Sequence, residues 1–240
     1  MWKGGSAIDP QLFQIESIPA ALWGPPAERV AVAVHGAQSS KTDIPFRLFA
    51  KAFPHTQVLS FDLPEHGDRK QDPTPCKPPI CVQELSAVLD YAESRWRDLS
   101  LFAVSMGAYF SLLACQNRPL SHAWFLSPVV DMVRLTQDMM RCFQISKARL
   151  EAEKMIPTPM GQTLYWDDYG YIRAHPIDRW PVPTDILRGS GDTLVAEDTV
   201  AAFADRFSCR MRTVEGAEHW FHTPEELEAL ALWFLETGPG

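Results

Sequence analysis

One stretch of the chain restricts its fold more than any other: Leu99–Cys115, which reads LSLFAVSMGAYFSLLAC. Its first apolar run predicts a buried parallel strand, and the apolar run after Ser105 predicts a buried helix. A strand that turns sharply into a helix has room only for small residues two positions before and after the turn. The side chain at the tip is strained and exposed, with the helix N-terminus directly behind it. These features predict that Ser105 is a nucleophile.

Two other interpretations of this stretch stay open at this point. A mostly apolar run of this length is also compatible with a short membrane span, although Ser, Gly and Tyr interrupt it. A serine between two apolar runs is, moreover, often a small core residue with no chemical role. The nucleophile interpretation therefore depends on finding partners for Ser105 elsewhere in the chain.

The rest of the chain alternates between expected strands and expected helices, and no internal repeat or linker divides it. Apolar runs rich in Val and Ala indicate strands, and apolar residues spaced three or four apart indicate helices. This alternation predicts the α/β class, with a mostly parallel central sheet and helices on both faces. After weak edge strands within Gln11–Trp23, the expected elements outside the central stretch are a strand over Arg29–His35, a helix over Phe46–Phe53, a strand over Gln57–Leu63, a helix over Val82–Trp96, strands over His122–Leu126 and Thr184–Arg188, a helix over Ala196–Phe207, a strand over Cys209–Val214 and a helix that begins with a capping box of Thr223 and Glu226.

The alternation is interrupted between about residues 131 and 180, where no strand is evident. The first half of this segment has a helical pattern, and the second half is rich in proline and aromatic residues. So many aromatic side chains argue against a disordered loop. We therefore expect one domain over residues 1–240, with a cap or lid insertion at about 131–180.

The composition excludes several classes of partner. The formal net charge of −8 argues against nucleic acid and anionic membranes, because both require a basic face. The 5 cysteines show neither CxxC spacing nor a paired framework, which is typical of reduced thiols. The N-terminal segment MWKGGSAIDP contains no apolar run of the kind found in signal peptides. We expect a cytoplasmic protein, and these features specify no oligomeric state.

Partners for Ser105 follow two later strands. In open α/β sheets, ligands bind outside the carboxyl ends of the strands, where Ser105, Asp192 and His219 are all expected to lie. A serine needs an imidazole to accept its proton, and the imidazole needs a carboxylate to fix its tautomer. The chain supplies these groups in the order Ser, Asp, His, and we predict that they form a catalytic triad.

With these residues identified, the sequence resembles the α/β-hydrolase family from about residue 29 to residue 234, the cap excepted. AVSMG around Ser105 resembles the G-x-S-x-G nucleophile elbow of that family, with Ala103 in place of the first glycine. GSGD, which ends at Asp192, resembles the loop that carries the acid. GAEH, which ends at His219, resembles the loop that carries the histidine.

Two further motifs carry the same resemblance. HGA, which ends at Ala37, resembles the HG-x loop of the family, and this implies that the backbone N–H groups of Ala37 and Met106 form an oxyanion hole. DLPEHG, which begins at Asp62, resembles a D-x-x-G-H-G turn. Glu65 stands there in place of a glycine, so we expect that loop to differ in shape.

Each triad assignment has a rival. Asp131 follows the strand after the nucleophile and is the alternative acid, whereas Asp198 is assigned to the start of a helix. His222 is the alternative base. The segment EHWFH that contains both histidines lacks a third convergent ligand, so we expect no metal site.

The resemblance and the triad together imply a serine hydrolase that acts on carboxylic esters or related acyl substrates through an acyl-enzyme, without a cofactor. Two alternatives stay open: cleavage of C–C or peptide bonds by the same groups, and ligand binding without catalysis. The cap is rich in methionine and aromatic residues, which predicts a small-molecule substrate of apolar character. The cap residues behind this prediction are Met132, Met139, Met140, Phe143, Met155, Met160, Tyr165 and Trp166. The candidate substrate contacts are Met140, Tyr165, Trp166 and Trp220.

Overall fold

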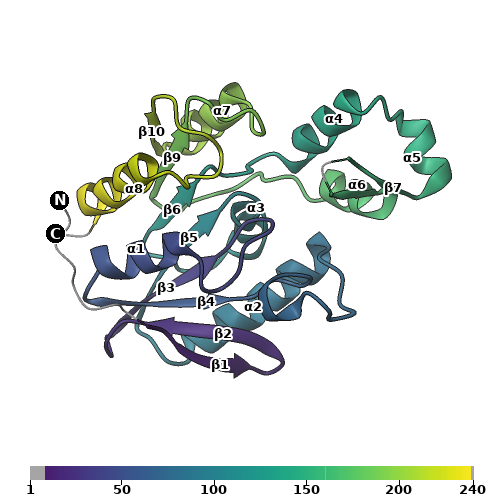
Figure 1. The fold of residues 1–240 in the computed structure, drawn as a ribbon. Helices are drawn as coiled ribbons and strands as arrows, with labels where there is room; N and C mark the ends of the chain where they lie inside the picture. Colours follow the sequence, from purple (N-terminus) through teal and green to yellow (C-terminus); the bar gives the residue numbers. More distant parts are fainter. Residues whose placement is uncertain (1–8, 160, 239–240) are drawn as a thin grey trace.

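The computed structural model describes residues 9–159 and 161–238. Most of the N-terminal segment discussed above, and Met160 of the expected cap, therefore lie outside the described residues. Within the described residues, the main sheet has eight strands in the order β1-β2-β4-β3-β5-β6-β9-β10 (Figure 1). These strands are β1 (Gln11–Ile15), β2 (Ile18–Trp23), β3 (Arg29–Val34), β4 (Thr56–Phe61), β5 (Asp98–Val104), β6 (Ala123–Leu126), β9 (Thr184–Gly189) and β10 (Arg210–Val214).

The sheet is mostly parallel, as the sequence predicts. Strand β2 pairs antiparallel with β1 and with β4, and the remaining neighbours all pair in parallel. The residues of β4 are all buried, as are nearly all those of β3 and β5. Parallel strands covered on both faces need apolar side chains on both faces, which explains runs such as RVAVAV.

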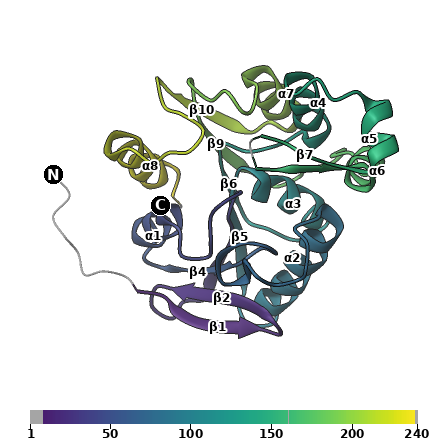
Figure 2. The same ribbon diagram turned by 45° about the vertical axis from the view of Figure 1, so that its right-hand side comes forward.

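Helices cover both faces of the sheet (Figure 2). Helices α1 (Ile44–Ala52) and α8 (Pro224–Thr237) pack on one face, around a cluster of aromatic side chains that includes Phe49 and Phe234. Helices α2 (Pro78–Glu93), α3 (Met106–Ala114) and α7 (Glu197–Phe207) contribute to the core on the other face. These features confirm the predicted α/β class.

The segment between β6 and β9 forms the insertion seen at the right of Figure 1. It contains α4 (Met132–Cys142), α5 (Lys147–Glu153), β7 (Met155–Pro157), β8 (Thr163–Tyr165) and α6 (Trp166–Ala174), and α6 contacts α2. The hairpin of β7 and β8 was not expected from the sequence. Each strand is three residues long, too short to show an alternating pattern.

The predicted sharp turn lies between β5 and α3. Ser105 has φ 52° and ψ −121°, a backbone conformation that is rare for any residue other than glycine. Its backbone N–H donates to the carbonyl of Leu126 (3.0 Å), and its own carbonyl accepts the N–H of Val129 (3.0 Å). The turn also packs closely against the end of β3, because a Cβ added at Gly107 would lie 2.5 Å from the carbonyl oxygen of His35.

We expect Gly107→Ala to lower the free energy of unfolding by about 1–3 kcal/mol, because the new methyl group meets backbone that cannot move aside. Gly170→Ala in α6 is the matched control: among the described residues, no atom beyond its chain neighbours and its own helix backbone lies within 4 Å of its added Cβ. That variant should be as stable as the wild type or up to about 1 kcal/mol more stable, since alanine favours the helix. Urea unfolding measures both, and wild-type stability of Gly107→Ala would contradict the packing described here.

Candidate active site

The structure brings Ser105, His219 and Asp192 together from three separate loops. Ser105 Oγ lies 2.9 Å from His219 Nε2, and His219 Nδ1 lies 2.8 Å from Asp192 Oδ2. All three side chains are almost fully buried. The expectation of an exposed side chain at Ser105 is therefore wrong, because its hydroxyl is covered by His219 and by the walls of a cavity described below. With its proton on Nδ1, the imidazole donates to the carboxylate and accepts from the serine hydroxyl, so Nε2 can receive the serine proton.

The loop after β9 fixes the orientation of Asp192. Its Oδ1 accepts the backbone N–H groups of Leu194 (2.9 Å) and Val195 (3.0 Å), which leaves Oδ2 for His219. Burial of this carboxyl opposes its ionisation, but the hydrogen bonds from His219 and the two backbone N–H groups outweigh burial and lower its pKa. Asp192 is therefore ionised at neutral pH and can stabilise a positive charge on the imidazole.

The loops that carry Asp192 and His219 touch each other. A Cβ added at Gly189 would lie only 2.0 Å from the carbonyl oxygen of Ala217. Gly191 donates its N–H to that same carbonyl (2.9 Å). The glycines of the GSGD motif thus allow the backbones after β9 and β10 to approach closely enough for the carboxylate to reach the imidazole.

Glu226 holds the His219 loop from the first turn of α8. Its buried carboxylate accepts the backbone N–H groups of Glu218 (2.8 Å), His222 (2.9 Å) and Thr223 (2.9 Å). Burial opposes ionisation of Glu226, but these N–H donors outweigh it and lower its pKa from 4.5 to about 2. The capping box of Thr223 and Glu226 was predicted from the sequence, whereas the bond to the residue before His219 was not.

We expect Glu226→Gln to lower the free energy of unfolding by about 2 kcal/mol at pH 7, because the amide can accept through only one of its two ends. The folded pKa lies below the unfolded one, so this stabilisation is present above about pH 5 and is lost as the pH falls toward 2. Urea unfolding of both proteins from pH 7 down to pH 4 should show the difference shrinking. A difference that grows on acidification would contradict this role for Glu226.

The rival residues are engaged elsewhere. Asp131 is the N-cap of α4, and its Oδ1 accepts the backbone N–H of Arg134 (2.8 Å). Asp198 lies in the first turn of α7, as expected. His222 is exposed, and its Nδ1 lies 3.1 Å from the carbonyl of Trp220. In the part of the chain that the structure describes, no three His, Cys, Asp or Glu side chains are grouped to hold a metal ion.

Ala37 and Met106, the expected oxyanion donors, line the same cavity as Ser105. The loop that carries Ala37 is braced by His35, whose Nδ1 lies 2.7 Å from the carbonyl of Gly36 and whose Nε2 accepts the N–H of Leu63 (3.0 Å). Burial lowers the pKa of His35 to about 4, so the ring is neutral at pH 7 and can keep both bonds.

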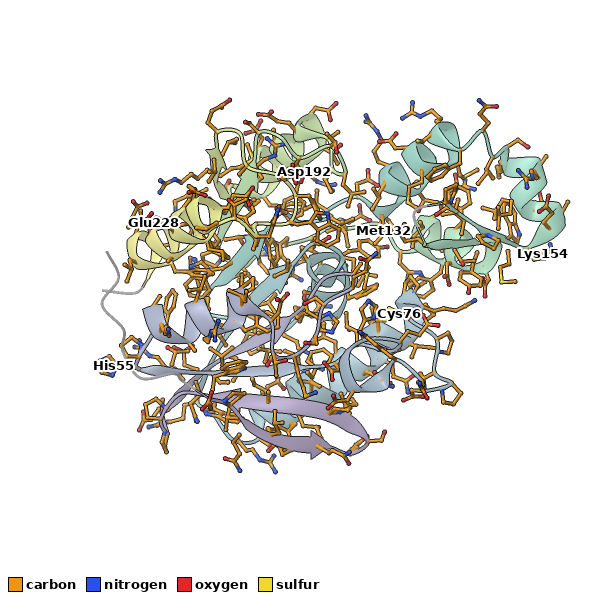
Figure 3. All side chains as sticks on the ribbon, in the orientation of Figure 1. His55, Cys76, Met132, Lys154, Asp192 and Glu228 are labelled. Atoms are coloured by element: carbon orange, nitrogen blue, oxygen red, sulfur yellow. The ribbon has the colours of Figure 1, made fainter. Side chains whose placement is uncertain are left out.

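The cavity beside Ser105 has a volume of about 200 Å³ and is bounded mainly by the insertion. Figure 3 labels Cys76, in the loop before α2, and Met132, at the start of α4, both of which line the cavity. Most of the lining side chains are apolar: Met106, Phe110, Val129, Met132, Leu135, Met139, Leu164, Tyr165, Tyr169, Ile172 and Leu194. A larger cleft of about 550 Å³ between α4, α6 and α7 does not include Ser105.

Of the four side chains expected to contact substrate, Tyr165 lines this cavity. The other three are not among the residues that line it. Met140 is buried in the core, and Trp166 lies near the ammonium groups of Lys147 and Lys154. Trp220 is exposed, with its ring 5.1 Å from that of His219.

Comparisons with known proteins agree with this fold. A model of the alpha/beta hydrolase family matches residues 31–231. The structure of Est1E from Butyrivibrio proteoclasticus with bound ferulic acid is similar, with a TM-score of 0.77, 17% identity, and coverage of 94% of this chain and 96% of that one. Mouse alpha/beta hydrolase domain-containing protein 10 has a TM-score of 0.76 and 15% identity, with 95% and 97% covered. The Pyrococcus furiosus esterase PF2001 has a TM-score of 0.65 and 17% identity, with 96% and 91% covered.

The search among curated proteins finds no match. None of the helices in the described residues is both long and apolar enough to cross a membrane.

Proposed function

Because the chain belongs to the alpha/beta hydrolase family, we propose that it is a serine hydrolase that cleaves carboxylic esters or related acyl substrates. The observation that carries this proposal is the hydrogen-bonded chain from Ser105 through His219 to Asp192, at the edge of an apolar cavity. A serine, an imidazole and an ionised carboxylate in this order form the arrangement that activates a serine for acyl transfer.

The geometry supports a mechanism with two chemical stages. Ser105 Oγ attacks the substrate carbonyl while His219 Nε2 takes its proton, and Asp192 stabilises the imidazolium that results. The N–H groups of Ala37 and Met106 stabilise the oxyanion of the tetrahedral intermediate. His219 then protonates the leaving alcohol. A water molecule attacks the acyl-enzyme by the same route, which releases the acid and restores Ser105.

The lining of the cavity supports an uncharged acyl group of small to moderate size. Methionine side chains from α4 and aromatic side chains from β8 and α6 surround the space next to Ser105. Burial of an apolar acyl group against them gains about 25 cal/mol per Å² of surface removed from water. An anionic group would lose its hydration in this cavity without a described cation to replace it, because Lys77 of the neighbouring loop is already paired with Asp167.

We expect Ser105→Ala to abolish the hydrolysis of a small activated ester such as p-nitrophenyl acetate. The melting temperature should stay within a few degrees of the wild-type value, because the substitution removes one hydrogen bond, to His219, and keeps the Cβ. Initial rates and thermal melts on the same preparations measure both effects. Near wild-type turnover by the variant would refute the assignment of Ser105.

We expect Asp192→Asn to lower kcat by roughly 10⁴-fold, because an amide at this position stabilises the wrong imidazole tautomer and no positive charge. Asp131→Asn is the matched control, since asparagine caps a helix as well as aspartate does, and its kcat should change little. Steady-state kinetics of both variants with one ester decides which of the two aspartates is the catalytic acid. If Asp131→Asn lowered kcat more than Asp192→Asn did, the catalytic acid would be Asp131, after the strand that precedes α4.

A further inference from the structure

The cavity beside Ser105 contains a thiol that the proposed mechanism does not use. Cys76 lines the cavity from the loop between Arg69 and α2, and its Sγ lies 3.6 Å from the Sγ of Cys81. Cys81 is the fourth residue of α2 and is fully buried. One sulfur therefore faces a space that small molecules can enter, and the other lies directly behind it.

The backbone keeps the two sulfurs in this position. The N–H of Cys76 donates to the carboxylate of Glu65 (3.1 Å), and the N–H of Cys81 donates to the carbonyl of Lys77 (2.9 Å). Glu65 has a left-handed backbone with φ 64°, and it stands where the family motif has glycine. Its side chain supplies a contact to Cys76 that a glycine lacks.

The surroundings of the pair favour one thiolate and one thiol. Hydrogen bonding from the Cys81 thiol lowers the pKa of Cys76 to about 6, against the effect of burial, and the His66 imidazole adds to this lowering. The pKa of His66 is raised in turn: burial opposes its protonation, but Cys76 and the carbonyl of Pro64 outweigh burial. The same interaction, together with burial, raises the pKa of Cys81, which therefore keeps its proton.

We propose that Cys76 and Cys81 form a redox pair, in which a hydroperoxide that enters the cavity oxidises Cys76 and Cys81 then closes an intramolecular disulfide. The proposal is independent of the hydrolase function, because it concerns the state of the two sulfurs and not the turnover of an ester.

The oxidation of Cys76 and the closure of the disulfide are two separate steps. The Cys76 thiolate attacks one peroxide oxygen, so that an S–O bond forms and the O–O bond breaks. Two electrons pass from sulfur to the peroxide, and the departing oxygen takes a proton from solvent to leave as water or alcohol. The Cys81 sulfur then attacks the sulfenic acid, the S–O bond breaks, and the hydroxyl leaves as water with the Cys81 proton.

The disulfide requires only a small movement of the chain. The two sulfurs must approach from 3.6 Å to the bonded distance of about 2.05 Å. Cys76 lies in a loop, which can accommodate this shift more easily than the first turn of α2. Oxidation therefore removes a thiolate from the lining of the cavity that also contains Ser105.

The test uses the full chain treated with hydrogen peroxide at pH 7, followed by alkylation of free thiols, trypsin and mass spectrometry. Both cysteines fall within one tryptic peptide, Gln71–Arg95, because trypsin does not cleave between Lys77 and Pro78. We expect this peptide to lose two hydrogen atoms and to escape alkylation until it is reduced. The disulfide should form on the order of tenfold faster than peroxide oxidises free cysteine.

Three variants separate the steps. In Cys81→Ser, and in Cys81→Ala if the first does not fold, dimedone should trap a sulfenic acid on Cys76, whereas Cys76→Ser should give no product at either site. Cys142→Ser removes an exposed thiol outside the pair and should leave the disulfide unchanged. The proposal is wrong if both cysteines of the wild-type peptide are still alkylated after peroxide, or if Cys76 reacts no faster than free cysteine.

Discussion

The geometry of the site depends on the strained backbone at Ser105. A left-handed residue between a strand and a helix is unfavourable by itself, and it persists here because neighbouring segments hold it from two sides. The end of β6 accepts its N–H, the segment after β6 donates to its carbonyl, and the end of β3 packs against Gly107. As a result, the hydroxyl projects from the sheet toward His219 instead of into the core.

The imidazole and the carboxylate are positioned differently, by polar contacts that fix the loops carrying them. Asp192 is fixed by two backbone N–H groups of its own loop, and the His219 loop is fixed by the buried carboxylate of Glu226. Both carboxylates are ionised at neutral pH for the same reason, since donated hydrogen bonds outweigh the cost of burial. The fold thus combines one strained turn with two hydrogen-bonded loops.

Much of this arrangement could be predicted from the sequence, because it rests on local patterns. Buried parallel strands are continuous apolar runs, so β3 to β6 and β9 were identified to within one or two residues. The Ser–Asp–His order followed from the loops after β5, β9 and β10. The short strands β7 and β8 leave no such pattern. The positions of Met140 and Trp166 depend on how the insertion packs, and that of Trp220 depends on the loop before α8. One sequence specifies neither.

The roles of Glu226 and of the Cys76–Cys81 pair were missed for a related reason. Glu226 was recognised as part of a capping box, but its bond to Glu218 spans eight residues and requires the loop geometry. The cysteines lack a CxxC spacing, and only the turn from the loop into α2 brings their sulfurs together. In both cases the sequence contained the residues, and the tertiary structure supplied the contact.

The most direct test of the account is to map the adduct formed when the intact protein reacts with a fluorophosphonate. We expect one adduct, on the oxygen of Ser105, that forms far more slowly when His219 is replaced by alanine. An adduct on another residue, or no reaction of the wild-type protein, would contradict the claim that the three loops assemble an activated serine.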